Sequence, residues 1–255
     1  MVGLLVVMVL LPRYIDPRTS LPVDDLPGWR QVVAEDFDAE VPLGGFSSSP
    51  YSPGFSAYDG FADTFGHGRY DPAEVLSVQD GSLDWDLHTS EGVHHVAAVV
   101  VTVPGSGWGQ TYGRYSVRFR SDAVPGYKLA FLLWPDTDRW GEGEIDFPEA
   151  HSLDSDAEIV ANLYRTGDGA DTPGTSAGFD SGVAVADSGW HVATVEWLPS
   201  SLTFELDGVV LGTKTAGVPS TSMHWVLQVE TAESGPDDSA RGHVQVDWVA
   251  AWSPE

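Results

Sequence analysis

The chain has 255 residues and no cysteine, which excludes disulfide bonds and thiolate metal sites. Lysine is almost as scarce, since Lys128 and Lys214 are the only two. Acidic residues number 38 against 12 basic ones, which gives a formal net charge of −26. Nucleic acids and anionic membranes are polyanions, so we expect neither to be a partner of the mature protein. A neutral polymer or a cation is compatible with this charge.

Helical periodicity is also scarce. Short apolar runs are separated instead by clusters of Gly, Pro, Ser and Asp, a texture typical of an all-β sandwich. Asp207-Gly208, between the runs 202–206 and 209–213, is a strong signal for a two-residue hairpin. The length suits one large domain, which we predict over residues 27–255.

The first 26 residues have a different character. Residues 1–11 form an apolar run that is too short to cross a bilayer as a helix but matches the hydrophobic region of a signal peptide. It lacks a basic start and a clear cleavage site, and an N-terminal strand is the alternative. Residues 12–26 contain three prolines and mixed charge, which predicts a linker. We therefore expect residues 1–26 to be leader and linker, and the protein to be secreted.

The most informative stretch reads Trp-Gly-Glu-Gly-Glu-Ile-Asp-Phe-Pro-Glu-Ala-His, from Trp140 to His151. It places three acids, Glu144, Asp146 and Glu149, within six residues of strand-like sequence. Side chains alternate along a strand, so the first two share a face and the third should point away. One extra residue, a β-bulge near Pro148, would return the third acid to the shared face, since proline is tolerated at bulges.

Retaining glycoside hydrolysis requires two carboxyl groups about 5–5.5 Å apart, one to attack the anomeric carbon and one to protonate the leaving oxygen. A like charge nearby raises the pKa of one of them, which separates the two roles. The middle acid, Asp146, could hydrogen-bond the nucleophile and tune it. On spacing alone, a solvated strand face or a cation site stays open as the alternative.

The hexapeptide Glu-Ile-Asp-Phe-Pro-Glu resembles the E-x-D-x-x-E signature of glycoside hydrolase family 16, which includes laminarinases, lichenases, agarases and carrageenases. Four further segments, at 28–37, 112–120, 189–208 and 243–252, resemble family segments in the same order. The resemblance covers about residues 28–252. It implies a β-jelly-roll sandwich of two curved antiparallel sheets, of the concanavalin A-like type.

By this resemblance, Glu144 is the nucleophile, Glu149 the acid/base and Asp146 the residue that tunes the nucleophile. The implied activity is retaining endo-hydrolysis of a polysaccharide, with a β-1,3- or mixed-linkage β-glucan as the leading substrate and a galactan as another. No cofactor is required for this catalysis, and we expect a monomer. A transglycosylase, a non-catalytic carbohydrate-binding protein and a metal-binding structural domain remain alternatives.

Substrate contacts are predicted around the motif. Trp134 and Trp140 bracket the loop before it, and sugars stack on aromatic rings. Trp134 is equally compatible with a core position. His151 follows Glu149 by two residues and is expected to hydrogen-bond the acid or a sugar, with a solvated loop-end histidine as the alternative.

Two later segments supply the remaining contacts. Asn162 and Tyr164 alternate with Leu163 on the expected next strand, so both can face the cleft. Tyr164 stands where many laminarinase-like members carry a histidine. Gln228 and Glu230 alternate in the same way and match positions where relatives contact substrate, with a buried polar network as the alternative.

The resemblance also implies a structural calcium ion away from the cleft, held by Glu35, a backbone carbonyl at Gly81 and Asp247. Oxygen ligands suit calcium, although Asp247 could equally be an ordinary strand-end acid.

Cationic and histidine side chains elsewhere are harder to assign. Arg118 and Arg120 alternate on one strand with Arg114, and exposed strand charges are the default interpretation. The alternative is that they reach the carboxylate cluster and lower the pKa of Glu144. His94-His95 shows no partner in the sequence and is interpreted as structural.

Overall fold

The structure is a computed structural model that describes residues 20–164 and 176–255. The predicted leader and residues 12–19 of the predicted linker lie outside the described residues. In the described ranges, no helix is both long enough and apolar enough to cross a membrane.

Within these ranges the chain forms sixteen strands, one short α-helix and two 3-10 turns. The strands are β1 (Trp29–Glu35), β2 (Phe55–Ala57), β3 (Gly68–Tyr70), β4 (Leu76–Gln79), β5 (Ser82–Ser90), β6 (Val93–Val101), β7 (Gly113–Ser121), β8 (Tyr127–Pro135), β9 (Glu144–Ala150), β10 (Glu158–Tyr164), β11 (Ser176–Ala184), β12 (His191–Leu198), β13 (Ser201–Leu206), β14 (Val209–Lys214), β15 (Met223–Thr231) and β16 (Gly242–Pro254). The helix α1 is Pro72–Val75, and the 3-10 turns are η1 (Phe46–Ser48) and η2 (Trp140–Glu142).

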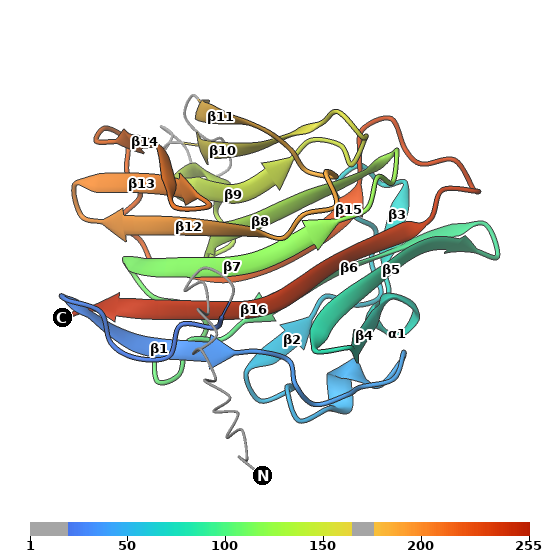
Figure 1. The fold of residues 1–255 in the computed structure, drawn as a ribbon, viewed down its shortest axis with the longest axis horizontal. Helices are drawn as coiled ribbons and strands as arrows, with labels where there is room; N and C mark the ends of the chain where they lie inside the picture. The colour runs from blue at the N-terminus through green and yellow to red at the C-terminus, as the bar shows by residue number, and fades with distance from the viewer. Residues whose placement is uncertain (1–19, 165–175) are drawn as a thin grey trace, which may run out of the picture.

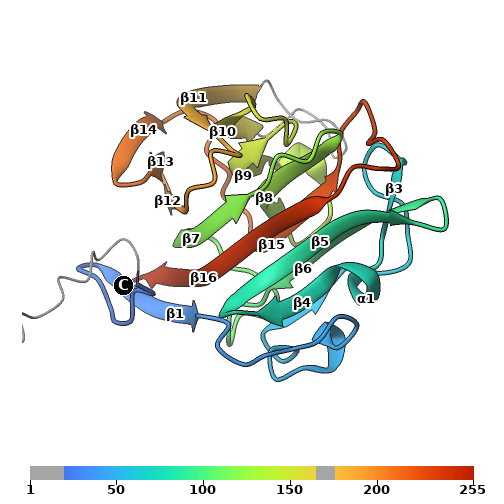
Figure 2. The same cartoon turned by 45° about the vertical axis from the view of Figure 1, so that its right-hand side comes forward.

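The strands form two curved layers. Hydrogen bonding runs in the order β11-β10-β9-β8-β15-β6-β5-β16-β7-β12-β13-β14, with β5 and β6 linking the layers. Figures 1 and 2 show β7, β12, β13 and β16 in one layer and β8, β9, β10 and β15 in the other. Every strand pair is antiparallel except β3 with β6 in the described residues. The predicted all-β antiparallel jelly roll is confirmed.

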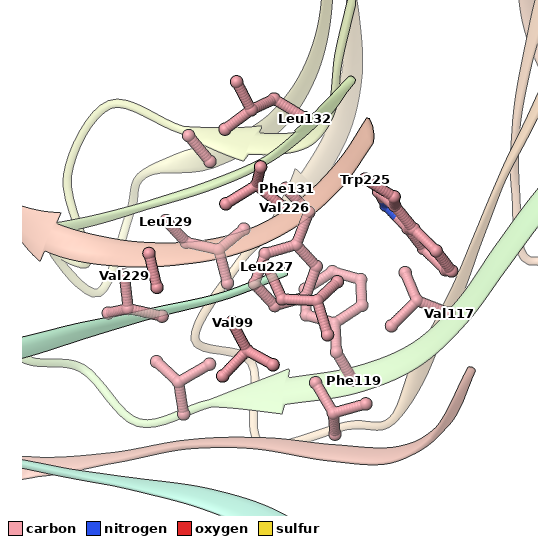
Figure 3. Close-up of a cluster of buried hydrophobic side chains, with 14 of the residues drawn as sticks. Val99, Val117, Phe119, Leu129, Phe131, Leu132, Trp225, Val226, Leu227 and Val229 are labelled. Carbon is pink, nitrogen blue, oxygen red and sulfur yellow. The ribbon is translucent and has the colours of Figure 1, made fainter. Parts of the chain in front are cut away.

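The core lies between the two layers, and every second side chain of β8 and β15 points into it. Leu129, Phe131, Leu227 and Val229 are fully buried and face Phe119 of β7, as Figure 3 shows. The residues between them point to the opposite face of the same layer, because side chains alternate along a strand. Burying one apolar face therefore fixes which side chains line the other face.

The predicted hairpin at Asp207-Gly208 is confirmed between β13 and β14. Both residues have positive φ angles, 52° and 80°, as a type I′ turn requires. Glycine has no steric penalty there, and aspartate tolerates the left-handed region better than most residues.

The end of the predicted linker is part of the domain. Leu21 and Leu26 pack on a small cluster that contains Trp29 and Trp252. The indole of Trp252 donates a hydrogen bond to the carbonyl of Asp24 at 3.0 Å. The packed domain therefore includes residues 20–26, which composition alone had assigned to a linker.

Candidate active site

The motif strand β9 contains the predicted bulge. Asp146 pairs with Leu132 of β8, and Glu149 pairs with Ala130, so two residues of β9 stand opposite the single residue Phe131. The extra residue returns the third acid to the face of the first two. The predicted bulge is confirmed.

The three acids of the motif line one open cleft of about 630 Å³. Asp146 and Glu149 are buried and Glu144 is half-buried. Aromatic side chains line the same cleft and come from several separate segments: Tyr58, Phe61, Phe65, Trp134, Trp140 and Tyr164. A carboxylate cluster with aromatic walls can bind a sugar and act on the bond between two sugars.

Glu144 and Asp146 share a proton. Burial raises the pKa of Glu144 to about 7, although hydrogen bonds from Asp146 and Trp140 lower it. Burial and the charges of Glu144 and Glu149 raise the pKa of Asp146 well above its usual range. The shared proton therefore resides on Asp146. Its O–H donates a hydrogen bond to the Glu144 carboxylate, which stays ionised. Asp146 is thus placed to tune the predicted nucleophile.

Glu149 and His151 form a second pair that shares a proton. The Nδ2 of Asn162 donates to Glu149 Oε2 at 2.7 Å, and His151 Nδ1 lies 3.2 Å from Oε1. Burial raises the pKa of Glu149, but the hydrogen bonds from His151 and Asn162 outweigh it and leave the pKa lowered. The hydrogen bond to Glu149 raises the pKa of His151. Without substrate, the proton of this pair therefore resides on His151.

A buried ion pair forms the floor of the cleft beside the acids. Lys128 of β8 pairs with Glu230 of β15 directly across the strands, with Nζ 3.0 Å from Oε1. Glu230 is fully buried and also accepts hydrogen bonds from the Tyr70 hydroxyl and the Thr64 N–H, at 2.9 and 3.1 Å. Glu230 lies in the lining of the cleft, and these contacts place its carboxylate in the buried polar network that the sequence left open as the alternative.

Lys128 was not predicted from the sequence. Its charge lowers the pKa of Glu144 and Glu149 and acts on Asp146 in the same direction. It is thus the cation that partly offsets three crowded carboxylates. The sequence carried one signal for it, its rarity as one of two lysines, but the register of β8 on β15 was needed to place it.

The other predicted contacts surround the acids. Trp134, Trp140, Tyr164 and Gln228 all line the cleft. The rings of Trp140 and Tyr164 lie 6.3 Å apart, and the Trp134 indole donates to Asp138 at 3.2 Å. Trp134 is half-buried and also packs against the hydrophobic core, so it has a part in both the cleft and the core.

The two arginines do not reach the acid cluster. Arg118 binds Asp247 at 2.6 Å, and Arg120 Nε donates to Gln245 at 2.7 Å. Both guanidinium groups lie 4.6 Å from the ring of Trp190, in the layer that does not hold the motif. The alternative that they lower the pKa of Glu144 is therefore excluded, because alternation identifies a shared face but not which layer of the sandwich holds it.

The predicted calcium ligands lie on or next to neighbouring strands. β1 and β5 both pair with the same side of β16, where Glu35 lies opposite Val249 and the turn at Gly81 leads into β5. Asp247 lies on β16 between these pairings, and one of its oxygens accepts from Arg118. The donor set consists of two carboxylates and a carbonyl, which fits calcium.

Comparison with known proteins places the chain in a family. The profile of Glycosyl hydrolases family 16 matches residues 102–250, more than half of the chain and the part that contains the motif. The chain belongs to this family. A β-glucanase from Paenibacillus macerans is 28% identical over 149 residues, covering 54% of this chain and 58% of that protein. A β-glucanase from Rhodothermus marinus is 26% identical over 197 residues, covering 72% and 65%.

These matches thus span less than two thirds of either curated relative. The crystal structure of the laminarinase from Rhodothermus marinus superposes with a TM-score of 0.70 at 20% identity. The superposition covers 89% of this family 16 chain and 98% of the laminarinase chain. This likeness shows a common fold over the whole sandwich.

Replacing Lys128 tests the buried ion pair. Lys128→Met leaves Glu230 buried without its cation, so we expect the free energy of unfolding to fall by about 3–5 kcal/mol. The double variant Lys128→Met/Glu230→Gln removes both charges and should recover most of that loss. Lys214→Met, whose ammonium lies 4.0 Å from the Phe179 ring, is the control and should cost less than about 1 kcal/mol. Urea unfolding measures all three, and equal losses in the single and double variants would contradict the assignment.

Proposed function

We propose that this family 16 protein is a retaining, endo-acting glycoside hydrolase that cleaves a β-1,3- or mixed-linkage β-glucan. The observation that carries the proposal is the bulge in β9, which places Glu144, Asp146 and Glu149 on one wall of an open cleft. The β-glucanases among its relatives support the choice of polymer. A neutral glucan also suits a cleft that contains this many carboxylates.

The proposed reaction has two steps. Glu144 attacks the anomeric carbon while Glu149 donates a proton to the glycosidic oxygen, so the bond to the leaving sugar breaks and a glycosyl-enzyme forms. Glu149, now a carboxylate, then takes a proton from water as the water oxygen attacks the same carbon. Glu144 leaves as a carboxylate. Asp146 donates its hydrogen bond to Glu144 in the resting state and fixes the orientation of the attacking oxygen.

His151 supplies the proton that the first step consumes. Glu149 is ionised in the free protein, because His151 and Asn162 stabilise its charge. Substrate in the cleft excludes water around the buried carboxylate, which disfavours a charged pair and favours the neutral tautomer. The proton then passes from His151 Nδ1 to Glu149 Oε1 over the 3.2 Å contact.

The first test compares the wild type with Glu144→Gln and Glu149→Gln on a panel of soluble β-glucans and galactans. We expect new reducing ends from the wild type on a β-glucan and a loss of at least about 10³-fold in each variant. Glu142→Gln is the matched control, since this nearby acid contacts Thr137 and Arg139 outside the cleft and should stay active. Binding without release of sugar would favour a carbohydrate-binding protein. Full activity in Glu144→Gln would overturn the assigned nucleophile.

The second test is the pH profile of His151→Gln. In the wild type, the Glu149–His151 pair loses its last proton at the raised pKa of His151. In the variant that proton is held by the carboxyl alone, so the alkaline limb of kcat/KM should move to lower pH. Measurement of kcat/KM from pH 4 to pH 9 on the preferred glucan provides the comparison. An unchanged alkaline limb would show that His151 does not supply the proton.

A structural calcium ion held by Glu35, Gly81 and Asp247 is part of the proposal. An ion that binds the folded state alone stabilises it by about 2.7 kcal/mol at 100 times its Kd. Melting in excess calcium should therefore occur at a higher temperature than in EDTA for the wild type, and Asp247→Asn should lose the difference. Asp156→Asn, in an exposed turn, is the control and should keep it. A wild type with the same Tm in both conditions would remove the ion from the proposal.

We also propose that the protein acts outside the cell and as a monomer. A long polysaccharide does not cross a membrane, so an enzyme that cleaves it within the chain must reach it outside. The three acids assigned to the reaction lie on one strand of one chain, so the proposed chemistry needs no residue from a second copy.

A further inference from the structure

A second cluster of metal-ligating side chains lies outside the cleft. Among residues 20–164 and 176–255, Glu74, His88 and His95 each offer one ligand atom, and these atoms lie within 4.8 Å of one another. The three come from α1, β5 and β6. None of them lines the cleft. Figures 1 and 2 both place α1 beside β4 and β5, far from β11 and β14.

Register explains why the two histidines meet. His88 and His95 are directly paired across β5 and β6, and their rings lie 5.4 Å apart with a tilt of 36°. Glu74 reaches the pair from α1, where it is exposed and free of the packing that fixes Val75. Two rings held by strands and one exposed carboxylate form a donor set that can bind an ion.

The contact of the His88 ring shows which of its nitrogens is left for an ion. His88 Nδ1 lies 2.9 Å from the carbonyl of Asp86, which can only accept, so this nitrogen carries the proton and Nε2 has the lone pair. His95 Nδ1 faces Asp71 Oδ2 at 3.6 Å. Metal-bound histidines usually donate their other N–H to a carbonyl or a carboxylate, which is the arrangement at His88.

His95 is the buried member of the group. The residue is only 8% exposed, and its Nδ1 is buried without a hydrogen-bond partner. A buried polar atom without a partner is costly. A cation on Nε2 would make the Nδ1–H a stronger donor and draw Asp71 into a proper hydrogen bond.

We propose that Glu74, His88 and His95 form a binding site for a divalent transition-metal ion of the zinc class. Two imidazole nitrogens and one carboxylate oxygen are ligands that zinc prefers, whereas calcium and magnesium prefer oxygen alone. A fourth position stays open for water. The ion clamps α1 to the hairpin of β5 and β6, and its effect is on stability rather than on the cleft.

Titration of the EDTA-treated and dialysed full chain with Zn²⁺ by calorimetry tests this site, with Tm as a second readout. We expect one site of micromolar or tighter Kd and a rise in Tm with Zn²⁺. Glu74→Gln and His88→Gln should each weaken binding at least about tenfold and remove the rise in Tm. Glu74 is exposed, so its variant will fold even if a histidine variant does not.

Two matched controls share the same hairpin. Glu91→Gln removes an exposed acid, and His94→Gln removes the neighbouring histidine, whose Nδ1 lies 2.7 Å from Thr89 Oγ1. Both should bind Zn²⁺ like the wild type. Loss of binding in Glu149→Gln but not in Glu74→Gln would place the ion in the catalytic cleft and overturn the proposal. Absence of Zn²⁺ binding by the wild type would also overturn it.

Discussion

One extra residue in β9 is the constraint on which the site depends. Without the bulge, strand alternation would turn Glu149 into the core, where Ile145 and Phe147 lie, and the cleft would hold two acids instead of three. The bulge is maintained because the flanking pairings of β9 with β8 and β10 are kept on both sides of it. The bulge thus places all three carboxylates of the motif on the same face of β9.

Crowding these acids has an electrostatic cost, and the neighbouring strands offset it. Glu144 shares a proton with Asp146, Glu149 shares one with His151, and Lys128 adds a positive charge beside them. Asp146 belongs to the motif itself, His151 follows the end of β9, and Lys128 comes from β8. The protonation pattern therefore depends on the neighbouring strand as well as on the hexapeptide.

Several features were predictable because their causes are local. The hairpin at Asp207-Gly208, the bulge near Pro148 and the strand that carries Asn162 all follow from backbone preferences or alternation within a few residues. Alternatives stayed open where contacts are long-range. Arg118 binds Asp247 within the layer opposite the acids, and the buried Glu230 carboxylate pairs with Lys128.

The sequence by itself determined the fold class, the family and the identity of the three central acids, because alternation, turn chemistry and motif spacing are written along the chain. Only the tertiary structure decided what those acids touch. It also brought His88 and His95 together, although His95 had no partner in the sequence. Strand register is set by the burial of an entire apolar face, and that condition cannot be read from any single segment.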